Sequence, residues 1–179
     1  MGFVSHVYDQ NSYLAWIKQA EEGKWLFEDK FTTEEQRGIF VHPLFLAMGQ
    51  ASRVTGIEPV YIFNAAQCVF GFALLMTAYW FSGLFLKTRR ERFYALLFIA
   101  LSAGFGWMLN KSAAEYFAKT YAFMPVDRWM GEAITFITIL TKPLFSFSMA
   151  MMLLIFTLMF LSYVRDKTSY AVISGLLGI

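Results

Sequence analysis

The sequence predicts an all-α protein: a polytopic bundle of transmembrane helices preceded by a segment of short amphipathic surface helices. Three observations predict this class. Of the 179 residues, 58% are hydrophobic and only 16% are charged, which is more apolar side chain than an ordinary soluble domain carries. Uncharged stretches long enough to cross a bilayer begin at Val60. Residues 1–59, by contrast, contain five Lys and Arg against eight Asp and Glu, so they are polar and acidic.

Charge and cysteine content exclude several classes of protein. The net charge of +2 is small and the basic residues do not line one face, so nucleic acid is not an expected partner. The single cysteine, Cys68, can form neither a disulfide within the chain nor a zinc site or CxxC redox pair. A soluble helical bundle would need a protein partner that covers Val60–Leu86 all round. Membrane lipid is therefore the expected partner of the apolar stretches.

Two short helices are expected within residues 1–59. Between Ser12 as N-cap and Gly23 as stop, four residues recur at the spacing of one helix face: Tyr13, Trp16, Ile17 and Ala20. A second helix is expected from Pro43 to Val54, because proline is favoured at a helix start and Gly56 follows its end. At about twelve residues this helix is too short to span, so it is expected at the membrane surface.

Three spans and part of a fourth are expected after residue 59. They cover about residues 60–86, 93–110 and 143–164, and residues 169–179 form the incomplete fourth. Charged segments at 87–92, 110–132 and 165–167 separate them. Because the last apolar run stops after about three turns, roughly half of a span, the chain is interpreted as a fragment of a longer protein.

The basic residues predict an orientation in the membrane. Four of them fall within six residues between the first two spans, which favours that side as cytoplasmic: Lys87, Arg89, Arg90 and Arg92. Alternate crossings then place residues 1–59 and 110–132 together on the extracytoplasmic side. Translocation of residues 1–59 to the extracytoplasmic side normally requires a transmembrane span before them. We therefore expect further sequence upstream of Met1.

Charged residues on the predicted extracytoplasmic side are the first candidates for chemistry. Asp9 could act as a general base if partial burial raised its pKa, or it could be an ordinary solvated or helix-capping carboxylate. His42 could hold phosphate or transfer a proton, or it could be a surface histidine bonded to a backbone carbonyl. Arg37 and Arg53 could bind a lipid-linked phosphate through bidentate hydrogen bonds, or they could be solvated or contact lipid headgroups.

A second group of candidates precedes the third predicted span. Asp127, Arg128, Trp129 and Glu132 could bind a sugar or a metal, although their spacing is not specific for a metal and loops often carry charge to stay outside lipid. The three predicted spans contain no Asp, Glu, Arg or His. Because a proton or ion pathway needs such groups, the sequence argues against a pump or an ion-coupled transporter.

These features occur in an order found in one enzyme superfamily. The motifs are Asp9-x-x-x-Tyr13-x-x-x-Ile17-x-x-Ala20-x-x-Gly23, His42-Pro43-Leu44 before a helix that ends at Gly56, Gly104-Phe-Gly-Trp107, Pro125-Val-Asp127-Arg-Trp129-Met-Gly-Glu132 and Lys142-Pro143. Together they cover nearly the whole chain, and the first two resemble the first extracytoplasmic loop of GT-C type membrane glycosyltransferases. That group includes protein O-mannosyltransferases, arabinose-transferring lipid A enzymes and bacterial relatives. The chain departs from many members in carrying Gln10 where a second acidic residue follows the first.

The resemblance implies an integral protein of the bacterial inner (plasma) membrane that takes a sugar from a polyprenyl-phosphate carrier at the extracytoplasmic face. Asp9 would remove the proton of the acceptor hydroxyl. Three basic residues would stabilise the departing phosphate: His42, Arg53 and Arg37. Asp127 and Glu132 would face the same cavity and bind the acceptor or a divalent metal ion. A fragment of this length is not expected to be active alone. The alternative is a non-catalytic membrane scaffold or a transporter fragment.

Overall fold

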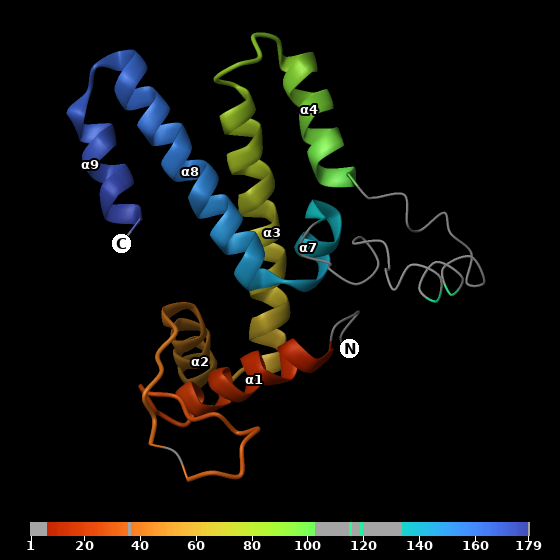
Figure 1. Cartoon of the computed structure of the whole chain (residues 1–179), viewed down its shortest axis with the longest axis vertical. Helices are drawn as coiled ribbons and strands as arrows, with labels where there is room; N and C mark the ends of the chain where they lie inside the picture. Colours follow the sequence, from red (N-terminus) through yellow and green to blue (C-terminus); the bar gives the residue numbers. More distant parts are fainter. Residues whose placement is uncertain (1–6, 36, 103–114, 116–118, 120–133, 179) are drawn as a thin grey trace. The chain divides into compact units, whose positions relative to one another are not determined.

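The computed structural model describes residues 7–35, 37–102, 115, 119 and 134–178, and its elements over these residues are helices. They are α1 (Val7–Glu21), α2 (Pro43–Thr55), α3 (Pro59–Ser82), α4 (Arg89–Leu101), α7 (Thr135–Thr141), α8 (Pro143–Arg165) and α9 (Thr168–Leu177) (Figure 1). An isolated antiparallel bridge joins Phe27 to Phe40 within the α1–α2 loop. The chain forms two compact units, Met1–Val69 and Phe70–Ile179, and α3 runs from one into the other. The predicted all-α class is confirmed.

Two of the described helices, α3 and α8, are long and apolar enough to cross a membrane. They contain 24 and 23 residues, with mean hydropathies of 1.6 and 2.3 over their most apolar windows. A 24-residue helix is about 36 Å long, which exceeds the roughly 30 Å of a bilayer core. Only 17% and 28% of these windows are buried, so the described chain leaves most of their apolar surface uncovered.

The second predicted span, 93–110, is described only in part. Helix α4 covers residues 89–101, and the remainder of the predicted span lies outside the described residues. The helix starts four residues before the predicted span because Thr88 and Glu91 form a capping box. The Glu91 amide donates to Thr88 Oγ1 at 3.3 Å, and the Thr88 amide donates to Glu91 Oε2 at 3.1 Å. The preceding span also ends earlier than predicted, because α3 stops at Ser82 and a turn follows.

Arg92 holds this turn between α3 and α4. Its Nε donates to the Leu86 carbonyl at 2.9 Å, and Nη2 lies 3.4 Å from the Gly83 carbonyl. These bonds satisfy two carbonyl groups of the turn that follows α3. The neighbouring Arg90 is exposed. Within the basic cluster, Arg92 therefore has a structural role in the turn.

Replacing Arg92 with glutamine is expected to destabilise the second unit by about 1–2 kcal/mol, because the shorter side chain cannot reach both carbonyls. Thermal unfolding of the full chain in detergent micelles measures the effect. The matched control is Arg90→Gln, which removes one positive charge from an exposed position and is expected to leave the melting temperature unchanged. Equal melting temperatures for the two variants would contradict the role of Arg92 in the turn.

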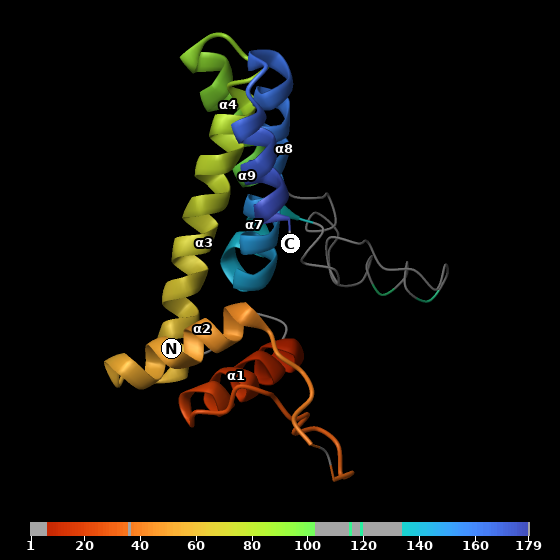
Figure 2. The same cartoon turned by 90° about the vertical axis from the view of Figure 1, so that its left-hand side faces the viewer.

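In the second unit, α3 and α8 pack in parallel. Phe70 packs on Phe147 with ring centroids 5.0 Å apart, and further along both segments Phe85 packs on Phe160 at 5.5 Å. Helix α7 lies close to α3 at Gly71, where an added Cβ would come within 2.9 Å of Ile139 Cγ2. Helix α9 lies beside α8, as two perpendicular views show (Figures 1 and 2).

Candidate functional site

In the first unit, α1 and α2 form a parallel pair. Tyr13 of α1 stacks on Phe45 near the start of α2, with ring centroids 4.8 Å apart. Further along, the α1 backbone at Ile17 meets Gly49, and Glu21 meets Ser52 near the end of α2. Contacts that advance together along both helices define a parallel arrangement. The predicted apolar face of α1 is confirmed, because Ile17 and Ala20 are fully buried.

The predicted start of α1 is wrong. The helix begins at Val7, so Ser12 lies inside it and Asp9 belongs to its first turn. Gln10 is 2% exposed and lies three and seven residues before Tyr13 and Ile17, so it continues the buried face by one turn. Because Gln10 is polar, the pattern of apolar residues did not show that the buried face extends to it.

Both predicted C-terminal stops are confirmed. Gly23 has φ of 96° and its amide donates to the Ala20 carbonyl at 3.0 Å, while the Lys24 amide donates to Gln19 O at 3.0 Å. This is the glycine-terminated hydrogen-bond pattern that closes many helices. Gly56 follows α2 with φ of 69°, and its amide donates to Ser52 O. Left-handed backbone at both positions explains why glycine ends each helix.

The parallel pairing places two predicted site residues at the same end of the unit. Asp9, of which only the backbone is described, lies one turn before Tyr13 in α1. His42 lies three residues before Phe45 and is the N-cap of α2. Because Tyr13 stacks on Phe45, Asp9 and His42, which precede them by about one turn, lie at the same end of the helix pair. Asp127 and Glu132 lie outside the described residues.

The two predicted arginines lie elsewhere in the unit. Arg53 occupies the last turn of α2, about 16 Å from His42 along the helix axis. Its guanidinium lies over Gly23, where an added Cβ would be 3.0 Å from Nη1. Arg37 is exposed in the loop between the helices. The described contacts therefore bring neither arginine to the end that holds Asp9 and His42.

The ring of His42 is partly buried among aromatic side chains. Its centroid lies 4.6 Å from that of Phe45 and 6.3 Å from that of Phe40. Burial lowers the pKa of His42 below the usual value, so the imidazole is neutral at pH 7. Nδ1 is buried and has no hydrogen-bond partner in the described structure, and the side chain does not cap α2. A neutral imidazole suits proton acceptance better than charge stabilisation of a phosphate.

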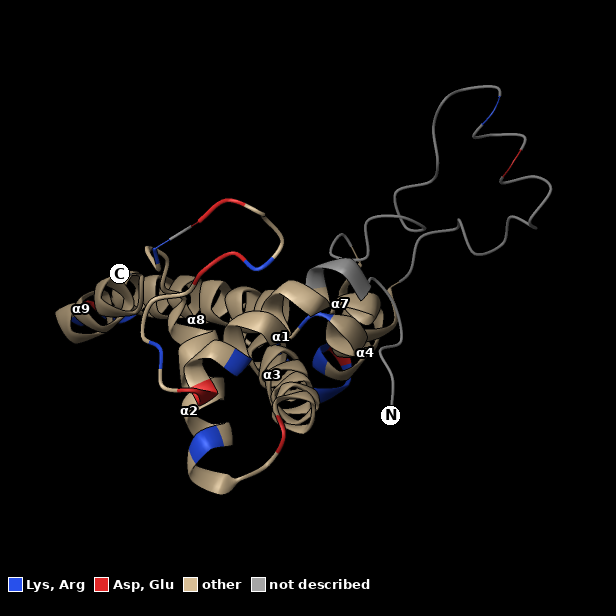
Figure 3. Cartoon of the chain, turned by 90° about the horizontal axis from the view of Figure 1, so that it is seen from below, with Lys and Arg blue, Asp and Glu red and all other residues tan. Residues whose placement is uncertain are grey.

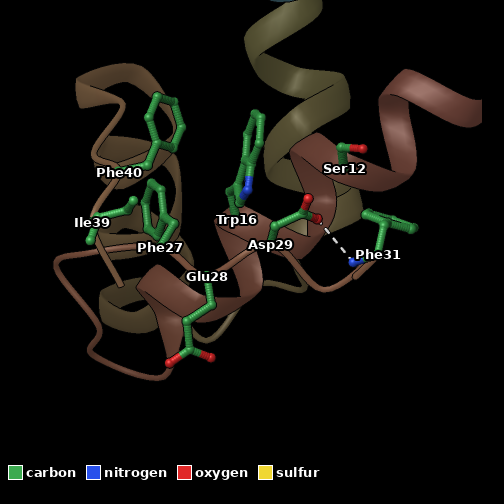
Figure 4. Close-up of a pocket in the computed structure, with 8 residues that line it drawn as sticks. All are labelled: Ser12, Trp16, Phe27, Glu28, Asp29, Phe31, Ile39 and Phe40. Carbon is green, nitrogen blue, oxygen red and sulfur yellow. Dashed lines mark hydrogen bonds between the residues drawn. The ribbon is translucent and has the colours of Figure 1, made fainter. Parts of the chain in front are cut away.

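A pocket of about 370 Å³ opens beside α1 in the same unit. It is lined by Ser12, Trp16, Phe27, Glu28, Asp29, Phe31, Ile39 and Phe40. The carboxylate of Asp29 lies between Trp16 and Phe31, whereas that of Glu28 points away from both rings (Figure 4). Asp29 Oδ1 accepts a hydrogen bond from the Phe31 amide at 2.9 Å. The pocket therefore combines aromatic walls with two acidic residues, and the carboxylate of Asp29 is the one that lies between the rings.

The buried side chain of Gln19 fixes the loop that carries this carboxylate. Its Nε2 donates to the Glu28 carbonyl at 3.0 Å, and its Oε1 accepts from the Glu28 amide at 2.9 Å. Sequence reasoning did not identify the pocket, since its lining comes from three separated segments. The sequence feature that could have indicated the pocket is the mixture of aromatic and charged residues in this loop, where acidic and basic positions alternate (Figure 3).

Glu21 links α1 to α2 through its carboxylate. Oε2 lies 2.6 Å from Lys18 Nζ, and Oε1 lies 3.0 Å from the hydroxyl of the fully buried Ser52. The hydrogen bond from Lys18 is the main reason that the pKa of Glu21 lies below its usual value, and the bond from Ser52 lowers it further. The folded state therefore favours the ionised carboxylate.

This lowered pKa predicts acid sensitivity of the first unit. The stability that Glu21 contributes is fully present above about pH 5 and is lost as the pH falls through the ordinary glutamate range near 4.3 and below. Thermal unfolding of the full chain between pH 7 and pH 3 measures it. Glu21→Gln is expected to be less stable at pH 7 and to show a smaller loss on acidification, whereas Glu22→Gln, at the exposed next position, should follow wild type. Identical pH profiles for Glu21→Gln and wild type would contradict this linkage.

Lys142 in the second unit is a buried basic residue that was not among the predicted site residues. It is 1% exposed at the break between α7 and α8, where the missing amide hydrogen of Pro143 prevents a continuous helix. Its Nζ lies 6.0 Å from the ring centroid of Phe145. A buried lysine beside a candidate span is a candidate functional residue, and in the sequence it stands directly before Pro143.

The described residues contain no group of three His, Cys, Asp or Glu side chains that could hold a metal ion. Two candidate sites lie in this part of the chain: the Asp9–His42 end of the α1–α2 pair and the aromatic pocket beside α1. No family model, curated protein or solved structure matches this chain.

Proposed function

We propose that this chain is a membrane glycosyltransferase-like protein that transfers a sugar from a polyprenyl-phosphate carrier at the extracytoplasmic face. The observation that carries the proposal is the parallel α1–α2 pair, which brings the positions of Asp9 and His42 to one end. A carboxylate and a neutral imidazole are both proton acceptors, and sugar transfer needs one for the acceptor hydroxyl. The same unit leads directly into α3, which is long enough to span a membrane.

The parallel packing of α3 and α8 supports a polytopic arrangement. If both helices cross the membrane in one direction, the chain between them must cross back once, and the predicted span at 93–110 supplies that return. The segments that precede α3 and α8 then lie on one side of the membrane. These segments carry Asp9 and Glu132, so the topology gives both acidic residues access to one aqueous face.

The proposed roles follow from the chemistry of each residue. Asp9 is the general base, and neutral His42 orients the acceptor hydroxyl or accepts its proton. Arg53 lies at the opposite end of α2 from His42 and Arg37 lies in the loop, so the described contacts assign neither guanidinium to the departing phosphate at this end. Asp127 and Glu132 bind the acceptor or a divalent metal ion.

The test is sugar transfer in membranes that contain the protein at its natural full length. Membranes with and without the protein are supplied with radiolabelled polyprenyl-phosphate sugars, and both transferred label and released carrier phosphate are measured. The proposal expects transfer only where the protein is present, with one carrier released for each sugar transferred. The proposal would be overturned if correctly inserted protein consumed none of the lipid-linked sugars.

The topology has a separate test. Cys68 is the only cysteine, so Cys68→Ser provides a background for Asp9→Cys and Glu132→Cys. A membrane-impermeant maleimide applied to sealed vesicles is expected to label both positions from the same side. Labelling from opposite sides would leave no shared site and would favour the non-catalytic scaffold.

A further inference from the structure

The pocket beside α1 contains four aromatic side chains: Trp16, Phe27, Phe31 and Phe40. Trp16 is held in place by neighbouring rings, because its centroid lies 5.1 Å from that of Phe40 and 5.6 Å from that of Phe45. Phe31 is 65% exposed and lies on the other side of the Asp29 carboxylate (Figure 4). Aromatic faces carry negative electrostatic potential, so such walls attract cations.

The pocket is lined by two carboxylates, those of Glu28 and Asp29, and they differ in their ion pairs. Glu28 is compensated, because its Oε2 lies 2.8 Å from Lys30 Nζ and 3.2 Å from Lys24 Nζ, and the bond from Lys30 is the main cause of its lowered pKa. Asp29 forms no such ion pair with the described residues and bonds only to the neutral Phe31 amide. No Lys or Arg is among the lining residues. The Asp29 charge is therefore available to a ligand.

The backbone around Asp29 is organised before any ligand arrives. Glu28, the residue before Asp29, is fixed by two hydrogen bonds with the Gln19 side chain, which donates one and accepts the other. The bond from the Phe31 amide fixes the orientation of the Asp29 carboxylate. A preorganised carboxylate loses less conformational freedom on binding than one on a free loop. The pocket therefore has both the charge and the rigidity of a binding site.

We propose that this pocket binds a small organic ammonium ion, with the cation between Trp16 and Phe31 and against the Asp29 carboxylate. A volume of about 370 Å³ accommodates a choline-sized group. A neutral sugar could stack on the same rings, but it would form no ion pair with the Asp29 carboxylate, whereas an ammonium ion interacts with that carboxylate and with the aromatic rings. This site is separate from the proposed sugar transfer, because it uses neither Asp9 nor His42.

Calorimetric titration of the full chain in maltoside micelles tests the proposal. The probes are choline and 3,3-dimethyl-1-butanol, which has the same shape without the charge. Choline is expected to bind at least about fivefold more tightly, a difference of about 1 kcal/mol. Asp29→Asn should weaken choline binding by a similar factor, and Glu35→Gln, in the same loop but outside the pocket, should not.

A second pair of variants tests the aromatic wall without disturbing the core. Phe31→Leu removes an exposed ring that lines the pocket, and Trp25→Leu removes a ring of similar exposure, 68%, that does not line it. Choline binding is expected to fall only in Phe31→Leu. Equal binding of choline and its uncharged isostere, no choline binding at all, or equal effects of the two variants would overturn the proposal.

The source of the ammonium group is distinguished by competition. If a short-chain phosphocholine lipid competes with choline, and this competition is lost in Asp29→Asn, the natural ligand is a lipid headgroup. Choline binding without such competition would identify a soluble ammonium compound. A failure of choline binding would leave the sugar-transfer measurement unaffected, so the two proposals fail independently.

Discussion

Replacing Gly49 with alanine is expected to separate α1 from α2 and to unfold the first unit. An added Cβ would lie 2.5 Å from the Ile17 carbonyl oxygen and 2.9 Å from the Glu21 amide nitrogen, and it would overlap the Cβ of Ala20. Two of these atoms belong to the α1 backbone, so no side-chain rotation relieves the clash. Overpacking of this kind costs about 1–3 kcal/mol, and we expect the upper part of that range. Thermal unfolding and proteolysis of the α1–α2 loop in the full chain measure the loss.

The matched control is Gly175→Ala. Gly175 lies within α9, an added Cβ there meets no atom within 4 Å, and alanine favours helix more than glycine does. This variant is expected to be as stable as wild type or slightly more stable. A Gly49→Ala variant with the stability and protease resistance of wild type would show that α1 and α2 do not pack at Gly49.

Helix ends were predictable where backbone chemistry alone determines them. Pro43 begins α2 and Gly56 follows its end, as predicted, and Pro143 begins α8. The starts of α1 and α4 were missed for a different reason. Gln10 is a buried polar residue that the apolar pattern does not count, and the reciprocal bonds of Thr88 and Glu91 extend α4 into a charged segment.

The candidate site could be predicted only as separate residues. The positions of Asp9 and His42 were identified from the sequence, but their common end depends on the parallel packing that Gly49 permits. Nothing local in the sequence indicates whether two helices joined by a long loop pack in parallel. The same packing sends Arg53 to the far end of the unit, which a spacing argument could not anticipate.

The aromatic pocket illustrates the role of long-range contacts. Its lining extends from Ser12 to Phe40, and the bridge between Phe27 and Phe40 closes the loop that brings the segments together. Local periodicity predicts which side chains of one helix share a face, but it does not predict a pairing across such a loop. The Gln19 side chain, which fixes Glu28, had no signal of its own in the sequence.

Asp9→Asn in the full-length protein is expected to lower sugar transfer by about 10²–10⁴-fold, the usual contribution of a general base. The substitution keeps the size of the side chain and removes its capacity to accept the hydroxyl proton. Membrane insertion is expected to be unchanged, and the loss of stability is expected to stay within about 1 kcal/mol, the usual contribution of a carboxylate in the first turn of a helix. Glu22→Gln, one residue beyond the other end of this helix, is the matched control and should transfer sugar at the wild-type rate.

The pH dependence of transfer separates Asp9 from His42 as the proton acceptor. Because burial lowers the pKa of His42, a rate that depends on its neutral form would fall only on the acid side of the usual histidine range. His42→Gln preserves hydrogen bonding but does not titrate, so it should leave the acid limb intact if Asp9 is the base and abolish it if His42 is the base. Transfer by Asp9→Asn at the wild-type rate, with the acid limb lost in His42→Gln, would move the base from α1 to the N-cap of α2.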